Sequence, residues 1–220
     1  DLVISGPFGA VKEQASGLYA QTLAERGFVT LAFDPSYTGE SSGEPRNIAS
    51  PDINTEDFMA AVDFMGLQPY VDRERIGVIG ICGMGGIALN AVAVDKRVKA
   101  VVASTMYDMS RVMSKGYNDS VTPEQREQAL EKMSLQRWED AANGKPAYQP
   151  AYNKLKGGEA QFLVDYADYY MTKRGYHPRA VNSGNSWSVT TPMAFMNFPL
   201  MTYIKEISPR PILFIHGEKA

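Results

Sequence analysis

The sequence predicts an α/β fold, in which helices cover both faces of a mostly parallel sheet. Short apolar segments bounded by Gly, Pro or charged residues recur along the chain, and segments with helical spacing separate them. The strand candidates are continuously apolar rather than alternating, as is typical of strands buried on both faces. This alternation of strand and helix continues to about residue 103 and is typical of a doubly wound sheet.

Five segments are predicted as strands, over residues 2–5, 29–34, 76–81, 98–103 and 211–216. Helices are predicted over residues 11–26, 55–67 and 87–94, and Asn54 or Thr55 would cap the second of them. The last strand is expected to be buried, so that His216 at its end would be a hydrogen-bonded structural histidine. The chain opens in an apolar run without an initiator Met and stops just after a strand, so we expect further residues at both ends.

From Tyr107 to Tyr203 the alternation stops, and this stretch holds nine of the 12 tyrosines and both tryptophans. We therefore assign residues 1–105 and 207–220 to an α/β core and residues 106–206 to a mainly helical cap insertion. Within the insertion, Thr122, Pro123 and Gln125 predict a helix start with a capping box. Asn143-Gly144 should close that region, and a second helix is expected over about 158–174.

Composition excludes several classes of function. The 22 basic and 25 acidic residues give a net charge of −3 without a long basic run, so neither a nucleic-acid nor a membrane partner is expected. One Cys and two His argue against disulfides and against a metal site. The apolar run over residues 76–94 is interrupted by five glycines, which favours a buried strand, turn and helix over a membrane span. We expect a cytoplasmic protein without metal or organic cofactor.

The clearest chemical signal lies in residues 75–89, where a strand enters a glycine-rich turn at Cys82 and then a helix. In a nucleophile elbow the reactive side chain projects from a strained turn, with small residues two positions to either side. Gly80 fits this pattern and Met84 does not. Two registers stay open: Cys82 is the nucleophile of an elbow lengthened by one residue, or Gly83 takes that position and there is no nucleophile. We favour Cys82, because a helix N-terminus lowers a thiol pKa, although most free cysteines are small buried hydrophobes.

Two other motifs compete with this interpretation. Residues 83–88 match the dinucleotide fingerprint, but the next strand ends in Ser104-Thr105 without the carboxylate that would hold a ribose. Residues 39–43 match G-x-S-x-G literally around Ser41, but Pro and charged residues follow and no helix can start there. Ser41 is therefore predicted to be a loop residue.

The order of these motifs resembles that of the α/β-hydrolase superfamily. The resemblance rests on the loop over residues 5–9, Asp34 after the second strand, the loop 39–43, the elbow 80–86 and the segment 210–217, and it covers residues 1–105 and 208–220. A Cys at the elbow is similar to the dienelactone hydrolase branch of that superfamily.

The resemblance implies a triad of nucleophile, histidine and acid, with an oxyanion hole. Cys82 would be the nucleophile, and the backbone N–H groups of Phe8 and Gly83 would form the hole, since Pro7 has no N–H. Ala220 occupies the expected position of the acid, and Glu218 is the nearest carboxylate. The family's histidine would follow one more strand beyond the chain, and His177 reads as a lid or surface residue rather than as the base.

We therefore expect a hydrolase that cleaves an ester, thioester or lactone carbonyl through an acyl-enzyme on Cys82. The Tyr, Trp and Met residues of the insertion predict either a lid over an apolar or aromatic small-molecule substrate, or the cap's own core or a homo-oligomer interface. Met84, Ala220 and the missing histidine leave a second class open, a hydrolase-fold binding module without catalysis. A dinucleotide-binding protein is the third.

Overall fold

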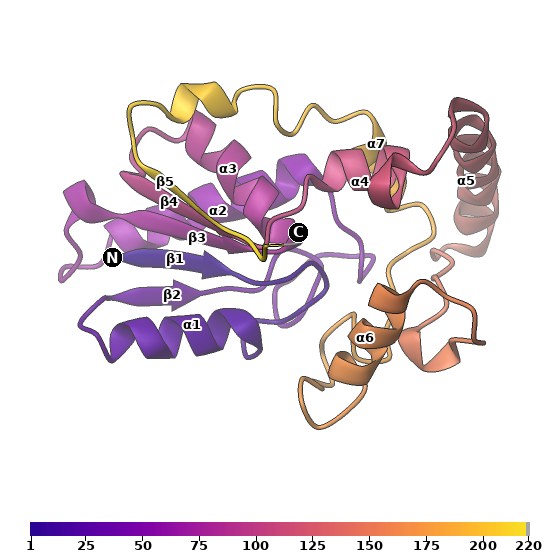
Figure 1. Cartoon of the computed structure of the whole chain (residues 1–220), viewed down its shortest axis with the longest axis horizontal. Helices are drawn as coiled ribbons and strands as arrows, with labels where there is room; N and C mark the ends of the chain where they lie inside the picture. Colours follow the sequence, from indigo (N-terminus) through magenta and orange to yellow (C-terminus); the bar gives the residue numbers. More distant parts are fainter. Residues whose placement is uncertain (219–220) are drawn as a thin grey trace.

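The computed structural model describes residues 1–218 and contains one parallel sheet of five strands in the order β2-β1-β3-β4-β5 (Figure 1). The strands are β1 (Leu2–Ser5), β2 (Thr30–Ala32), β3 (Gly77–Ile81), β4 (Ala100–Ser104) and β5 (Ile212–Ile215). The chain moves from β1 to β2 in one direction and from β3 through β4 to β5 in the other. The order therefore reverses between β1 and β3, and such a reversal opens a crevice at the carboxyl ends of the strands.

Within residues 1–218, three helices flank the sheet and four others lie beyond the carboxyl ends of its strands (Figure 1). The flanking helices are α1 (Ala15–Ala24), α2 (Pro51–Gly66) and α3 (Gly83–Val94). The others are α4 (Met109–Lys115), α5 (Pro123–Asn143), α6 (Gln161–Tyr170) and α7 (Pro192–Met196). Short 3-10 turns are η1 (Arg73–Arg75), η2 (Tyr117–Asp119), η3 (Tyr152–Lys154) and η4 (Ile204–Ile207).

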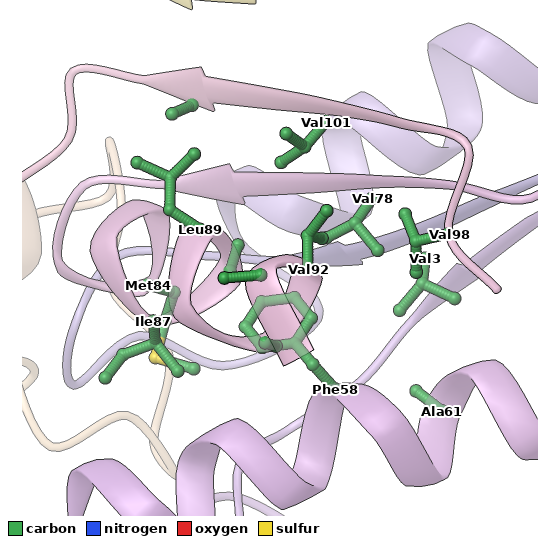
Figure 2. Close-up of a cluster of buried hydrophobic side chains, with 14 of the residues drawn as sticks. Val3, Phe58, Ala61, Val78, Met84, Ile87, Leu89, Val92, Val98 and Val101 are labelled. Carbon is green, nitrogen blue, oxygen red and sulfur yellow. The ribbon is translucent and has the colours of Figure 1, made fainter. Parts of the chain in front are cut away.

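The main core lies between the sheet and helices α2 and α3. Strand β3 is buried along its whole length, and α3 is buried from Gly83 to Ala93. Figure 2 shows Phe58 of α2 and Leu89 of α3 among the valines of the strands. The apolar run at 76–94 is thus the centre of a layered fold, and no helix within residues 1–218 is both long and apolar enough to cross a membrane.

The segment before β5 is anchored in the same core. Phe195, Leu200 and Ile207 are fully buried in the main cluster, and η4 packs against α3. The opposite face of the sheet carries a smaller cluster of Ile4, Ile79 and Ile81 under α1.

The structure confirms the predicted fold class and several local signals. Thr122 and Gln125 form a full capping box at the start of α5, and Gly144 ends that helix in the left-handed conformation. The predicted cap of α2 was wrong: Ser50 is the N-cap residue, and Asn54 and Thr55 lie buried inside the helix. Pro51 begins the helix because its fixed φ and missing N–H suit the first turn.

Within residues 1–218 the last strand is not buried, in contrast to the prediction. β5 is an edge strand, and the exposed fractions of Leu213, Phe214 and Ile215 are 55%, 49% and 44%. Within residues 1–218 no further strand pairs with β5, so His216 is exposed rather than a buried structural residue.

A buried polar pair joins α2 to α3 and allows a stability prediction. The Asn90 side chain donates to Thr55 Oγ1 at 2.9 Å, and that hydroxyl donates to the Pro51 carbonyl at 2.6 Å. Thr55→Val should leave the Asn90 amide unpaired and lower the free energy of unfolding by about 1–3 kcal/mol in urea titrations. Thr55→Ser keeps the hydroxyl and should cost less. Equal losses in the two variants would contradict the hydrogen-bond argument.

Candidate active site

Cys82 lies in the turn between β3 and α3, at the carboxyl end of the central strand. Its backbone has a φ of 57° and a ψ of −127°. A residue with a Cβ rarely adopts such a conformation, which costs about 1–3 kcal/mol. The structure thus has Cys82, rather than Gly83, in the turn, and Gly83 is the first residue of the helix. The side chain is half-buried.

Close packing between β3 and α3 holds this turn. A Cβ atom on Gly80 would lie 2.6 Å from the Met84 carbonyl oxygen and 2.7 Å from the Gly85 Cα. Gly85 is therefore the small helix residue that lets α3 approach Gly80, and it comes three positions after Cys82 instead of the two that are usual in a nucleophile elbow. Met84 is tolerated because its side chain is buried in the core instead.

Two backbone N–H groups converge on the Cys82 sulfur. Ser5 of β1 is paired with Gly80 of β3, so the loops that follow these two strands lie side by side. The Phe8 N–H from the first loop and the Gly83 N–H from the helix start both lie close enough to the Cys82 side chain to stabilise its thiolate. The site thus lies at the switch point of the sheet, where open α/β folds bind ligands.

The predicted direction of the thiol pKa shift was wrong. Burial raises the pKa of the Cys82 thiol, and the hydrogen bonds from Gly83 and Phe8 oppose this effect without overcoming it. A helix N-terminus favours the thiolate, but desolvation disfavours the charged form more strongly here.

This direction allows a pH prediction. A raised pKa means that the thiolate forms at higher pH, so alkylation of Cys82 by iodoacetamide in a protein of residues 1–220 should have a midpoint above the ordinary value of about 8.5. The rate can be followed by mass spectrometry of the peptide that contains Cys82, with N-acetylcysteine alkylated in parallel as the reference. A midpoint below that of the reference thiol would contradict the prediction.

Three tyrosines from the segment between β4 and β5 lie near enough to the same sulfur to sense its charge. Burial raises the pKa of Tyr152, Tyr166 and Tyr170, and the charge that Cys82 would carry as a thiolate raises each of them further. The Tyr166 ring also packs against the rings of Tyr152 and Tyr170, so the three tyrosines form one aromatic cluster near Cys82.

The remaining predicted residues lie elsewhere. Glu218 is exposed, and within residues 1–218 no hydrogen bond or ion pair joins it to Cys82 or to a histidine. His216 lines a cavity of about 990 Å³ together with Tyr107, whose N–H donates to the Cys82 carbonyl. His177 is half-buried and its backbone N–H donates to Ser183 Oγ.

Ser41 is a loop residue, as predicted. Its hydroxyl donates to the Asp34 carbonyl at 2.7 Å. Arg46 donates to the carbonyls of Gly39, Ser41 and Gly43, and so closes the loop on itself. The literal G-x-S-x-G match is a structural loop rather than an elbow.

The glycines of the dinucleotide fingerprint are used for packing within the protein. A Cβ on Gly83 would meet Phe8 Cβ at 2.7 Å and the Met109 sulfur at 2.9 Å, and one on Gly86 would lie 2.4 Å from the Tyr107 carbonyl oxygen. Protein atoms therefore occupy the space that a pyrophosphate would need beside these glycines.

The sequence did not identify the residues that complete the surroundings of Cys82. Tyr166 and Tyr170 lie on α6, inside the helix predicted over about 158–174, but its sequence did not show that they lie near Cys82. Asn182 contacts the Phe8 loop across 174 positions. The clustering of tyrosines between residues 107 and 203 was the one signal that could have located them.

A parallel sheet with a strained residue at the central strand-to-helix turn and paired N–H groups beside it defines an α/β-hydrolase-fold protein. The model of the prolyl oligopeptidase family matches residues 14–154, and the chain belongs to this family within that superfamily.

Relatives and solved structures agree with this fold. The chain is 80% identical to the uncharacterized protein PA2218 of Pseudomonas aeruginosa over 100% of the chain and 59% of the relative. The crystal structure of PA2218 has a TM-score of 0.96 at 81% identity, and the match covers 99% of this chain and 68% of that one. The α/β hydrolase GrgF of Penicillium sp. has a TM-score of 0.74 at 24% identity, with 99% and 71% covered.

A curated relative with a named activity is the thiohydrolase aneE of Aspergillus aculeatus. It is 26% identical over 215 residues, which are 96% of this chain and 66% of the relative. The chain thus spans about three fifths to two thirds of the length of these curated relatives.

Proposed function

We propose that the protein is a hydrolase that cleaves a thioester or ester carbonyl through an acyl-enzyme on Cys82. The observation that carries the proposal is the convergence of the Phe8 and Gly83 N–H groups on a sulfur held in a strained turn. When the sulfur attacks a carbonyl, the negative charge develops on an oxygen beside it. The same two N–H groups would then bind that oxygen, and each such donor is worth about 3–4 kcal/mol.

The order of steps follows from this geometry. The Cys82 sulfur forms a bond to the carbonyl carbon, the resulting oxyanion collapses, and the alcohol or thiol departs with a proton. Water then attacks the acyl-enzyme, releases the acid and returns the proton to the sulfur. Within residues 1–218 no imidazole or carboxylate forms a hydrogen bond with Cys82, so assays require the full-length protein.

The surroundings of the sulfur favour an apolar or aromatic acyl group. Tyr152, Tyr166 and Tyr170 form a cluster of aromatic rings near it, and the relative named a thiohydrolase favours thioesters among the possible carbonyl substrates. We further propose that residues 106–206 act as a cap over this site and that the protein is of the dienelactone-hydrolase-like type with cysteine as nucleophile.

The test is to trap the acyl-enzyme. Full-length protein mixed with p-nitrophenyl butyrate or with an N-acetylcysteamine thioester, quenched in acid and digested, should carry an added butyryl mass on the peptide that contains Cys82. An adduct on another residue would contradict the assignment. Turnover without any adduct on Cys82 would do so too, and neither turnover nor adduct on both kinds of substrate would support the binding-module class instead.

A further inference from the structure

One buried side chain, that of Asn182, holds the loop that carries the Phe8 N–H. Its Nδ2 donates to the Phe8 carbonyl at 2.9 Å, and its backbone N–H donates to the Gly9 carbonyl at 3.1 Å. A Cβ on Gly9 would lie 2.4 Å from Asn182 Oδ1, and Gly9 has a φ of +86°. Two consecutive carbonyls of the loop are thus held by a single residue at close range.

The side chain of Phe8 is fixed as well. Its ring stacks on Trp187 with centroids 4.3 Å apart and an interplanar angle of 25°, and it meets Phe195 edge to face at 5.6 Å. With the ring and the carbonyl both held, little rotation remains about the Phe8 backbone. The direction of its N–H toward Cys82 is therefore set by residues between β4 and β5, far away in sequence.

The segment around Asn182 also contacts residues that follow strands β1 and β2. Arg179 forms ion pairs with Glu13 and Glu40, and the Gln14 side chain donates to the Gly175 carbonyl. Loss of the Asn182 amide would leave these contacts intact. We therefore expect Asn182 variants to fold.

We propose that Asn182 is a positioning residue for the oxyanion hole, which acts by holding the Phe8 carbonyl so that the Phe8 N–H points at the reacting carbonyl oxygen. This inference rests on the proposed function of Cys82.

The experiment compares two reactions of the same sulfur. Attack on p-nitrophenyl butyrate creates an oxyanion, whereas iodoacetamide alkylation forms a sulfur–carbon bond and expels iodide without one. In full-length Asn182→Ala, the pre-steady-state burst of p-nitrophenol should slow about ten- to hundred-fold. The alkylation rate on its alkaline plateau, where the thiol is fully ionised, should stay within about two-fold of the original, because it needs no hole.

Two further variants separate positioning from general structure. Asn182→Asp keeps the shape but removes the donor, so it should be impaired as much as the alanine variant. Asn185→Ala removes an equivalent amide from the same segment, where it donates to the carbonyls of Pro178 and Ala180, and should leave both reactions unchanged.

Three results would overturn the inference: an unchanged burst in Asn182→Ala, full activity in Asn182→Asp, or parallel losses of burst and alkylation. Failure of the proposed function has a different signature, since Cys82→Ala would then keep its activity. Circular dichroism and thermal melts of each variant verify the fold.

Discussion

Cys82→Ala is expected to lower turnover of p-nitrophenyl and thioester substrates by the full-length protein by about 10³-fold or more, because no covalent intermediate can form. The backbone donors at Phe8 and Gly83 stay in place in this variant, so some substrate binding and a small residual rate should persist. The strain in the turn also stays, because Ala has the same difficulty as Cys at a φ of 57°. The melting temperature should therefore change little, and the loss should appear in kcat.

The matched control is Ser41→Ala, which removes the serine of the literal G-x-S-x-G segment. Its hydroxyl donates to the Asp34 carbonyl within the loop after β2. Turnover by this variant should stay within about two-fold of the original, because the substitution removes one loop hydrogen bond of a half-buried residue and leaves Cys82 in place. Undiminished turnover in Cys82→Ala, or a loss in Ser41→Ala as large as that in Cys82→Ala, would contradict the assignment of the nucleophile.

The sequence predicted the elbow because its determinants are local. Gly80, Cys82 and the glycines that follow lie within a few residues of one another, and the close contact of a strand with the next helix needs glycine wherever it occurs. The same holds for the capping box at Thr122 and for the strands that form the centre of the sheet. Fold class and the position of the turn could therefore be predicted from the pattern, which favoured Cys82 over Gly83 without deciding between the two registers.

Other features depend on contacts that no local pattern encodes. The pKa of the Cys82 thiol is raised because several segments together exclude water from it, so helix polarity alone gave the wrong sign. The hold of Asn182 on Phe8 joins residues 174 positions apart. The exposure of β5 depends on what pairs with its outer edge, and the apolar side chains of that strand look the same in either case.

Gly80→Ala should be the most damaging single-methyl change in the described fold. The added Cβ would lie 2.6 Å from Ala88 Cβ, 2.6 Å from the Met84 carbonyl oxygen and 2.7 Å from the Gly85 Cα. None of these atoms is the end of a flexible side chain, so β3 and α3 must separate. We expect a loss of about 3 kcal/mol in the free energy of unfolding, which corresponds to a fall of about 6–12 °C in melting temperature.

Gly66→Ala makes the same chemical change at the end of α2, where the nearest atoms to the new Cβ are 3.8 Å away. This control should be neutral or stabilising by up to about 1 kcal/mol, because Ala favours helix over Gly. Since the packing of β3 on α3 also sets the turn at Cys82, Gly80→Ala should slow Cys82 acylation even at temperatures where the variant is fully folded. Equal melting temperatures for Gly80→Ala and Gly66→Ala would contradict this prediction. The contact between β3 and α3 at Gly80 would then not be what holds Cys82 in its strained conformation.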